Sequence, residues 1–351
     1  MNSSDKPTGN AGAATLQATT AMLPLTPPPL PEPISLEDIA ALSEEIRDLA
    51  AQKNAVILAH NYQVAEVQDV ADYTGDSLGL SIQAANAKAD RIVFCGVHFM
   101  AETAKILSPD KQVLIPDTRA GCSLAASIDA DQLRAWKDEN PGATVVMYVN
   151  TTAEVKALTD YCCTSSNAAA VVNAIPDDQE ILFGPDMFLG SYVEKVTKRR
   201  MKVWLGECHV HAGIRPAELN EMLEKYPDAD LMIHPECGCS TQAMEYLACG
   251  DIDPERTFIL STSGMVEHVK QSDAKQFVVA TETGIFHPLK LAAPDREFIP
   301  ANVGAVCGFM KAITLTNLRD ALRDEQYEVN VDPAIAELAR VPIERMIAIT
   351  A

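Results

Sequence analysis

The stretch Val56-Ile57-Leu58-Ala59-His60-Asn61-Tyr62 is an apolar run that ends in polar residues, and the chain contains two further runs of this design. The second is Val145-Val146-Met147-Tyr148-Val149-Asn150, and the third is Leu231-Met232-Ile233-His234-Pro235-Glu236. Their first polar residues, at positions 60, 148 and 234, are spaced 88 and 86 residues apart. Repetition at a nearly fixed period indicates copies of one structural unit. The sequence therefore predicts three similar α/β units whose polar strand ends face a common centre.

The first two copies also match beyond these strands. At the same offset, Ala65-Glu66-Val67 aligns with Ala153-Glu154-Val155, and Ser77 aligns with Ser165. Chance likeness between generic βα units is the alternative explanation, but chance would not confine the identities to one register. The repeat is therefore expected to extend over whole units.

Short apolar strands alternate with helical stretches, which is the pattern of parallel sheets covered by helices on both faces. The predicted fold class is α/β, with three similar three-layer, parallel-sheet domains around a pseudo-threefold axis. We expect domains at residues 34–118, 119–205 and 206–308, with the helical segment 309–351 packing back on the first. Helices are predicted near 64–73 and 99–107, and strands near 55–59, 91–95, 112–116, 144–149, 180–183, 201–205, 230–233, 257–261 and 276–280.

The composition narrows the class of protein. The 351 residues carry a formal net charge of −21 and are 47% hydrophobic, as in a soluble globular protein. So acidic a chain argues against broad binding to nucleic acid or to an anionic membrane, and no apolar run approaches the roughly 20 residues that span a bilayer. Residues 1–33 are rich in Pro, Ala and Thr, lack the pattern of a signal peptide, and are predicted to be a disordered tail. We therefore expect a cytoplasmic protein, in which nine cysteines indicate metal or redox chemistry rather than disulfides.

Polar side chains at the strand ends are the first candidates for a binding site, because ligands of open α/β sheets bind beyond the carboxyl ends of the strands. The pairs at these ends are His60 and Tyr62, Tyr148 and Asn150, and His234 and Glu236. A hydroxyl follows in each copy, and the three residues are Ser77, Ser165 and, beyond an insertion around 237–250, Thr262. The alternative role for these hydroxyls is to cap helix N-termini, which is common for Ser and Thr.

One cysteine follows the third predicted strand of each copy: Cys122, Cys208 and Cys307. Three thiolates converging on the axis could hold an iron–sulfur cluster with one iron free of a protein ligand, whereas a fully ligated cluster takes four cysteines. An iron with an open position can act as a Lewis acid on a substrate. Two alternatives remain: each cysteine could be a small buried apolar residue, or Cys237-Gly238-Cys239 could form a redox or zinc site with Cys249.

The chain resembles the quinolinate synthase family over about residues 35–350. The stretches that carry the resemblance are Ala59-His60-Asn61-Tyr62-Gln63, Gly75-Asp76-Ser77-Leu78, Phe94-Cys95-Gly96-Val97-His98-Phe99-Met100-Ala101-Glu102-Thr103-Ala104, Tyr148-Val149-Asn150, Thr164-Ser165, Phe183-Gly184-Pro185-Asp186, His234-Pro235-Glu236, Ser261-Thr262 and Met310-Lys311-Ala312-Ile313-Thr314. The resemblance implies three α/β domains around a pseudo-threefold axis and a [4Fe–4S] cluster held by Cys122, Cys208 and Cys307. It also implies condensation of iminoaspartate with dihydroxyacetone phosphate to quinolinate, with loss of phosphate and water, in NAD biosynthesis. Cys307 stands alone where some members carry Cys-x-x-Cys-x-x-Cys.

For this reaction we expect Glu236 to be the principal general base, hydrogen-bonded near His234. Tyr62 and His60 are expected to relay protons, while Tyr148 and Asn150 orient the imine and carbonyl groups. The other predicted substrate contacts are Ser77, Ser165, Thr262, Val149, Pro235 and His211.

The enzyme that oxidises aspartate to the unstable imine is the expected transient partner. One alternative function is an iron–sulfur hydro-lyase for another small hydroxy acid. A second is a non-catalytic iron–sulfur sensor, although a sensor has no need for polar pairs at facing strand ends.

Overall fold

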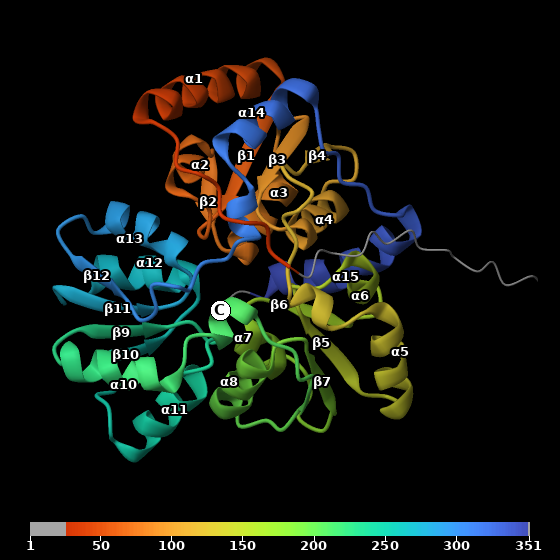
Figure 1. The fold of residues 1–351 in the computed structure, drawn as a ribbon. Helices are drawn as coiled ribbons and strands as arrows, with labels where there is room; N and C mark the ends of the chain where they lie inside the picture. The colour runs from red at the N-terminus through yellow and green to blue at the C-terminus, as the bar shows by residue number, and fades with distance from the viewer. Residues whose placement is uncertain (1–25, 350–351) are drawn as a thin grey trace, which may run out of the picture.

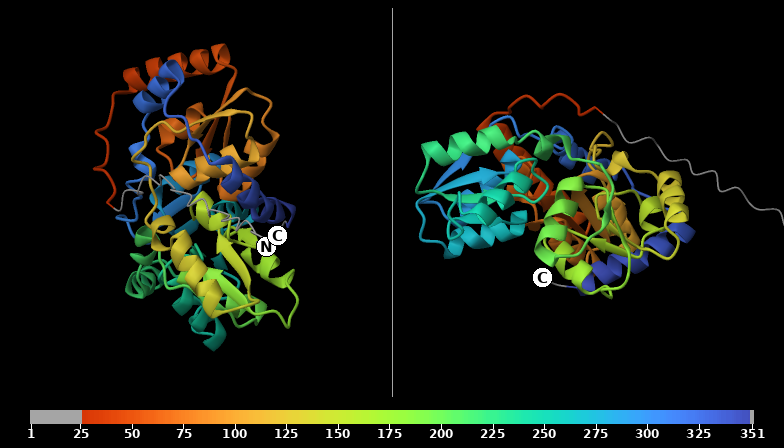
Figure 2. Two further views of the ribbon diagram at one scale, coloured as in Figure 1. Left: turned by 90° about the vertical axis from the view of Figure 1, so that its right-hand side faces the viewer. Right: turned by 90° about the horizontal axis from the view of Figure 1, so that it is seen from below.

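A computed structural model of the protein describes residues 26–349, and these form three four-stranded parallel sheets flanked by helices (Figure 1). The three sheets lie in separate lobes around a common centre, as the two further views confirm (Figure 2). The strand orders are β2-β1-β3-β4, β6-β5-β7-β8 and β10-β9-β11-β12. Each sheet therefore has the same topology, and the predicted fold class of three similar α/β units is confirmed.

The first unit begins with helix α1 (Leu36–Gln52), where the side chain of Ser35 accepts a hydrogen bond from the Asp38 backbone N–H and so caps the helix. Its strands are β1 (Ala55–His60), β2 (Tyr73–Gly75), β3 (Arg91–Cys95) and β4 (Gln112–Leu114). Its other helices are α2 (Ala65–Val70), α3 (Ser77–Asn86) and α4 (His98–Leu107).

The second and third units repeat this order. The strands of the second unit are β5 (Thr144–Tyr148), β6 (Tyr161–Cys163), β7 (Ile181–Gly184) and β8 (Lys202–Val203), with helices α5 (Ala130–Glu139), α6 (Ala153–Lys156), α7 (Ala168–Asn173) and α8 (Met187–Thr197). The strands of the third unit are β9 (Asp230–Ile233), β10 (Thr257–Ile259), β11 (Gln276–Ala280) and β12 (Glu297–Pro300), with helices α9 (His209–Ala212), α10 (Pro216–Lys225), α11 (Ser240–Cys249), α12 (Thr262–Gln271) and α13 (Phe286–Ala292).

The strands β1, β5 and β9 pair in parallel with a neighbour on both sides. They are almost entirely buried, because helices cover both faces of a parallel sheet. The first polar residue of each sequence repeat stands at the carboxyl end of one of these strands. The polar residues of the repeat therefore lie at equivalent strand ends in the three units, which surround a common centre (Figure 1).

The prediction of three strands per unit is wrong, because each sheet has a fourth strand. The missed strands are β2, β6 and β12, and residues 64–73 form the shorter helix α2 followed by β2 rather than one helix. Strands β2 and β6 are three residues long, which is too short for an alternating or continuous apolar pattern to reveal. In the third unit β10 is the edge strand that corresponds to β2 and β6, so Cys307 follows the fourth strand, β12.

The C-terminal segment contains α14 (Leu315–Asp324) and α15 (Pro333–Ala348). Helix α14 packs on α1, while α15 packs on α6 and β6 of the second unit and on α4 of the first. The domain boundaries remain a prediction. Of the predicted disordered tail, residues 1–25 lie outside the described residues, and residues 26–33 form neither helix nor strand. Within the described residues, no helix has the length and apolar character needed to cross a membrane.

Candidate active site

One cavity lies where the carboxyl ends of the three sheets meet, and all three units contribute to its wall. Thirteen of the fifteen residues predicted from the sequence line this cavity: His60, Tyr62, Ser77, Cys122, Tyr148, Asn150, Ser165, Cys208, His211, His234, Glu236, Thr262 and Cys307. The other two, Val149 and Pro235, are not among its lining residues. The backbone N–H of Val149 donates to the Cys163 carbonyl, and the Val149 carbonyl accepts the backbone N–H of Thr151. The fold therefore brings nearly all the predicted site together, while the role of each residue remains a prediction.

The three predicted hydroxyls occupy equivalent places, each a few residues after the edge strand β2, β6 or β10. Ser77 and Thr262 are the first residues of α3 and α12, and neither caps its helix. The side chains of the preceding residues, Asp76 and Ser261, accept the capping hydrogen bonds instead. The alternative of helix capping is therefore wrong for these two hydroxyls, which line the cavity.

His60 lies at the end of β1 with its ring buried. Its Nδ1 accepts a hydrogen bond of 3.1 Å from the backbone N–H of Tyr62, which places the proton of the neutral ring on Nε2. Burial lowers the pKa of His60 to about 4. The imidazole is therefore neutral near pH 7 and can donate from Nε2.

The hydroxyl of Tyr62 forms a buried cluster with two residues of the third unit. Its oxygen lies 2.6 Å from Thr281 Oγ1 and 3.2 Å from His211 Nε2, and these last two atoms are 2.9 Å apart. Burial raises the pKa of Tyr62 well above its ordinary value and lowers that of His211 to about 3. These contacts therefore join the protonated phenol of Tyr62 to the neutral imidazole of His211, both directly and through the Thr281 hydroxyl.

Glu236 is buried beside three ring side chains. The Tyr148 hydroxyl donates to its Oε1, His234 Nδ1 is 3.6 Å from Oε1, and His211 Nδ1 is 3.5 Å from Oε2. Burial raises the pKa of Glu236 above its ordinary range, with a further contribution from the charge of Asp186. A carboxyl in this setting binds a proton more tightly than an exposed one.

Each predicted cluster cysteine stands just before a short helix: Cys122 before η1 (Ala125–Ser127), Cys208 before α9, and Cys307 before η3 (Met310–Ala312). Backbone N–H groups near the start of each helix donate to the sulfur atoms, including that of Ala125 to Cys122 Sγ at 3.4 Å. Burial raises the pKa of all three thiols, to about 12 for Cys122 and about 11 for Cys307, and the backbone N–H groups offset part of this rise. The positive charge of a bound metal favours the thiolate, which is the form that binds iron.

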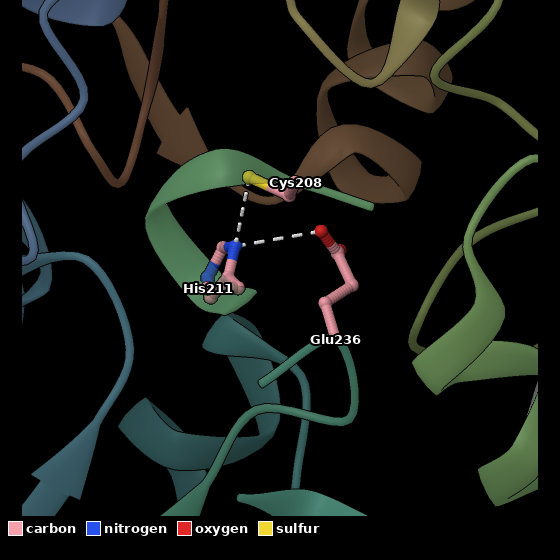
Figure 3. Close-up of side chains that lie close together, drawn as sticks. All are labelled: Cys208, His211 and Glu236. Atoms are coloured by element: carbon pink, nitrogen blue, oxygen red, sulfur yellow. Dashed lines mark hydrogen bonds and ion pairs between the residues drawn. The ribbon is translucent and has the colours of Figure 1, made fainter. Parts of the chain in front are cut away.

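Among the described residues, one group of three potential ligands converges closely enough for a single metal ion (Figure 3). It consists of Cys208, His211 and Glu236, whose ligand atoms all lie within 4.8 Å of one another. His211 Nδ1 is 3.3 Å from Cys208 Sγ. The sequence predicts a different role for each residue, a cluster ligand for Cys208, a substrate contact for His211 and a general base for Glu236, and it does not predict that all three meet at one point.

The rival cysteine site does not assemble. Cys237 and Cys239 are buried in the core of the third unit, where the Cys237 thiol donates to the Ala280 carbonyl at 2.9 Å. Cys249 is exposed at the far end of α11, which begins directly after Cys239. A helix of that length separates them by about 15 Å, so these three cysteines cannot share one ion.

The polar residues near the site that were not predicted include Thr281, and Glu282, which lines the cavity. They directly follow the buried strand β11, so they form a polar pair at a strand end like those of β1, β5 and β9. The same signal could have found them, but the repeat was traced only through the central strand of each unit.

Comparisons with known proteins identify the family of this chain. Residues 44–348 match the family model of the quinolinate synthetase A protein. The chain belongs to the quinolinate synthetase A family. It is 57% identical over 317 residues to the quinolinate synthase of Mycobacterium sp. strain KMS. The aligned residues cover 89% of this chain and 94% of that protein.

Two further relatives of the quinolinate synthetase A family are close to this chain. The quinolinate synthase of Mycobacterium tuberculosis strain H37Ra is 58% identical over 306 residues, covering 87% of this chain and 88% of that protein. The quinolinate synthase of Mycolicibacterium paratuberculosis is 56% identical over 311 residues, covering 88% and 89%. The likeness therefore includes all three units.

Proposed function

We propose that this chain is a quinolinate synthase, which condenses iminoaspartate with dihydroxyacetone phosphate and releases quinolinate, phosphate and water. The observation that carries the proposal is a single cavity whose wall combines acid–base groups from three strand ends with three cysteine thiols. Family membership supports the choice of substrates. Because the imine is unstable, a transient contact with the aspartate-oxidising enzyme that makes it is part of the proposal.

Cys122, Cys208 and Cys307 are proposed to hold a [4Fe–4S] cluster. The donor set suits such a group, because each thiol follows the last strand of a different sheet (β4, β8 or β12), all three line one cavity, and each sulfur accepts backbone N–H groups. Thiolates around a cluster bind different irons, so they need not converge as tightly as ligands of a single ion. When bound, the cluster would supply an iron without a protein ligand, a Lewis acid for a substrate hydroxyl.

Glu236 is the proposed general base. Its carboxylate is buried, accepts a hydrogen bond from Tyr148 and lies beside His234. The raised pKa of Glu236 brings its proton affinity closer to what a base needs near neutral pH. Glu236 would therefore take the proton that is released as the carbon–carbon bond forms.

His60 and Tyr62 are the proposed proton relay. His60 presents the N–H of its Nε2 because its Nδ1 accepts the Tyr62 backbone N–H. The Tyr62 phenol can pass a proton along its short contacts with Thr281 and His211. The two rings, whose centroids are 4.7 Å apart, thus offer two protonated groups in the wall of the cavity.

Two buried polar atoms in the cavity are available for substrate. Among the described residues, Asn150 Oδ1 and His234 Nδ1 are buried without a hydrogen-bond partner. A buried polar atom without a partner is costly, so both atoms are proposed to meet polar groups of the substrate. The hydroxyls of Ser77, Ser165 and Thr262 would donate to carboxylates and phosphate.

The proposed function is tested with protein purified and reconstituted without oxygen. We expect brown protein with about four irons per chain, the content of a [4Fe–4S] cluster, and quinolinate from dihydroxyacetone phosphate and freshly generated iminoaspartate. Colourless protein with one zinc at Cys208, His211 and Glu236 would refute the cluster. Loaded protein that dehydrates a hydroxy acid but forms no quinolinate would point to the hydro-lyase instead.

The ligand assignment has a matched control. We expect Cys122→Ser to lose most of its iron and cluster absorbance, whereas Cys249→Ser, at an exposed cysteine, keeps both. A full cluster in Cys122→Ser would contradict the assignment. The base assignment is tested by Glu236→Gln, which should keep the cluster and lose about 10²-fold or more in kcat.

A further inference from the structure

A buried ion pair that the proposed chemistry does not use lies at the edge of the cavity, where only its carboxylate, Glu282, is a lining residue. Glu282 follows β11, and Lys311 lies in η3; Lys311 Nζ is 3.0 Å from Glu282 Oε1. The Glu282 side chain is 0% exposed and that of Lys311 is 9% exposed. Desolvation of two charges offsets much of their attraction, so a buried ion pair is weak evidence for stability. A role in fixing neighbouring groups is the better explanation for its presence.

Each member of the pair has a second contact, and both contacts lead to the site. Glu282 Oε1 accepts the backbone N–H of Cys307 at 2.9 Å. Lys311 Nζ donates to the backbone carbonyl of Tyr62. The pair therefore connects the loop that carries one proposed cluster ligand to the strand end that carries the proposed proton relay.

The surrounding backbone is shaped for this connection. Gly284 N–H donates to Glu282 Oε2 at 2.6 Å. A Cβ atom at Gly284 would lie only 2.7 Å from Lys311 Nζ and 2.7 Å from the Tyr62 carbonyl carbon and oxygen. Only glycine therefore lets the ammonium group and the Tyr62 carbonyl meet here.

We propose that Glu282 and Lys311 are positioning residues, which hold the Tyr62 backbone at a fixed place relative to the Cys307 loop. This inference rests on the proposed function. Two of the contacts that hold Tyr62 involve the pair or its neighbour: Lys311 donates to the Tyr62 carbonyl, and Thr281, the residue next to Glu282, contacts the Tyr62 hydroxyl. Loss of the pair would let the phenol shift relative to the reacting atoms, and a displacement of about 1 Å can cost about 10²-fold in rate.

The test compares Lys311→Met, Glu282→Gln and the double variant, each reconstituted without oxygen and assayed per mole of cluster. A single variant leaves one charge buried and unpaired, so its melting temperature should fall, whereas removal of both charges should restore it. We expect kcat to stay about 10²-fold low in the double variant, with KM values nearly unchanged, because the donor to the Tyr62 carbonyl is still missing. This split between stability and kcat is not expected of a structural ion pair.

Two further variants complete the test. Gly284→Ala keeps both charges but pushes the Tyr62 carbonyl away, so we expect the same loss in kcat even if Lys311→Met fails to fold. Lys53→Met breaks a partly exposed Lys–Glu bridge outside the cavity and should leave kcat unchanged.

The outcomes separate this inference from the proposed function. Wild-type protein that makes no quinolinate would refute the function itself. If the wild-type protein is active, a double variant with wild-type kcat per cluster would overturn the positioning role. Variants that lose only cluster content, with kcat per cluster unchanged, would also overturn it, because the pair would then serve the Cys307 loop alone.

Discussion

The replacement of Glu102 by Gln is expected to change how the stability of this protein depends on pH. Glu102 lies on the buried face of α4, and its Oε2 accepts the backbone N–H of Ala153 at 3.2 Å. It therefore links the first unit to α6 of the second. Burial raises the pKa of Glu102 from 4.5 to about 7. Gln keeps the size and the acceptor but cannot ionise.

The sign of the effect follows from the raised pKa. Below pH 4.5 the carboxyl is protonated in both folded and unfolded chains, and its contribution to stability is intact. As the pH rises towards 7, the unfolded chain loses the proton while the folded chain keeps it, so stability falls by about 1.4 kcal/mol per pH unit. Above the folded-state pKa of about 7 both chains lose the proton, so the fall in stability stops there. Between about pH 5.5 and about pH 8 the fall therefore extends over roughly 1.5 pH units, and the wild type should lose about 2 kcal/mol relative to Glu102→Gln.

Urea unfolding followed by tryptophan fluorescence measures this difference, because Trp136 and Trp204 pack together in the second unit, with ring centroids 5.4 Å apart. The exposed Glu267 is the control, since hydrogen bonds from Gln271 and Lys270 lower its pKa. Glu267→Gln should show no gain over wild type as the pH rises. A difference between wild type and Glu102→Gln that stays flat or reverses sign would refute the reasoning.

Three further variants test the cavity and the core. Tyr148→Phe removes the hydrogen bond to Glu236 and should lower kcat about 10²-fold with the cluster intact, as steady-state kinetics and absorbance would show. Asn150→Ala removes an unpartnered buried oxygen that is proposed to meet substrate, so KM should rise about tenfold; an unchanged KM would exclude that contact. Phe94→Ala empties a fully buried site in β3 and should lower the free energy of unfolding by about 3–5 kcal/mol in urea titrations, whereas a loss below about 1 kcal/mol would contradict the packing.

The sequence predicted the architecture well because the repeat and the buried central strands leave strong patterns. A parallel strand covered on both faces must be apolar throughout, as in β9, so length and composition identify it. Edge strands such as β2 and β6 pair on one side and span three residues, so neither pattern applies to them. Thr262 was matched to Ser77 from the sequence, but the place of β10 at the sheet edge, equivalent to β2 and β6, became visible only in three dimensions.

The site was predictable to the extent that it lies at strand ends. His60, Tyr148 and His234 each stand at the carboxyl end of the sheet that carries them, and this follows from parallel strands alone. The convergence of Cys208, His211 and Glu236 does not follow from this, because it depends on where the loop after β8 and helix α9 lie relative to the end of β9. The identity of the substrates came from family resemblance, since polar pairs and thiols are compatible with several reactions.

The charge of the cavity wall constrains how anionic substrates can bind. Within the described residues, the lining contains the carboxylates of Asp76, Glu236 and Glu282 but no Lys or Arg side chain. The lining side chains that can donate to carboxylates and phosphate include Ser77 and Thr262 at the N-termini of α3 and α12, where the helix dipole favours negative charge. Burial keeps His60 neutral in the empty cavity, and an anion nearby favours the protonated ring. The negative charge of a bound substrate would thus raise the pKa of the His60 imidazole, so that substrate binding itself would favour the protonated ring that transfers the proton.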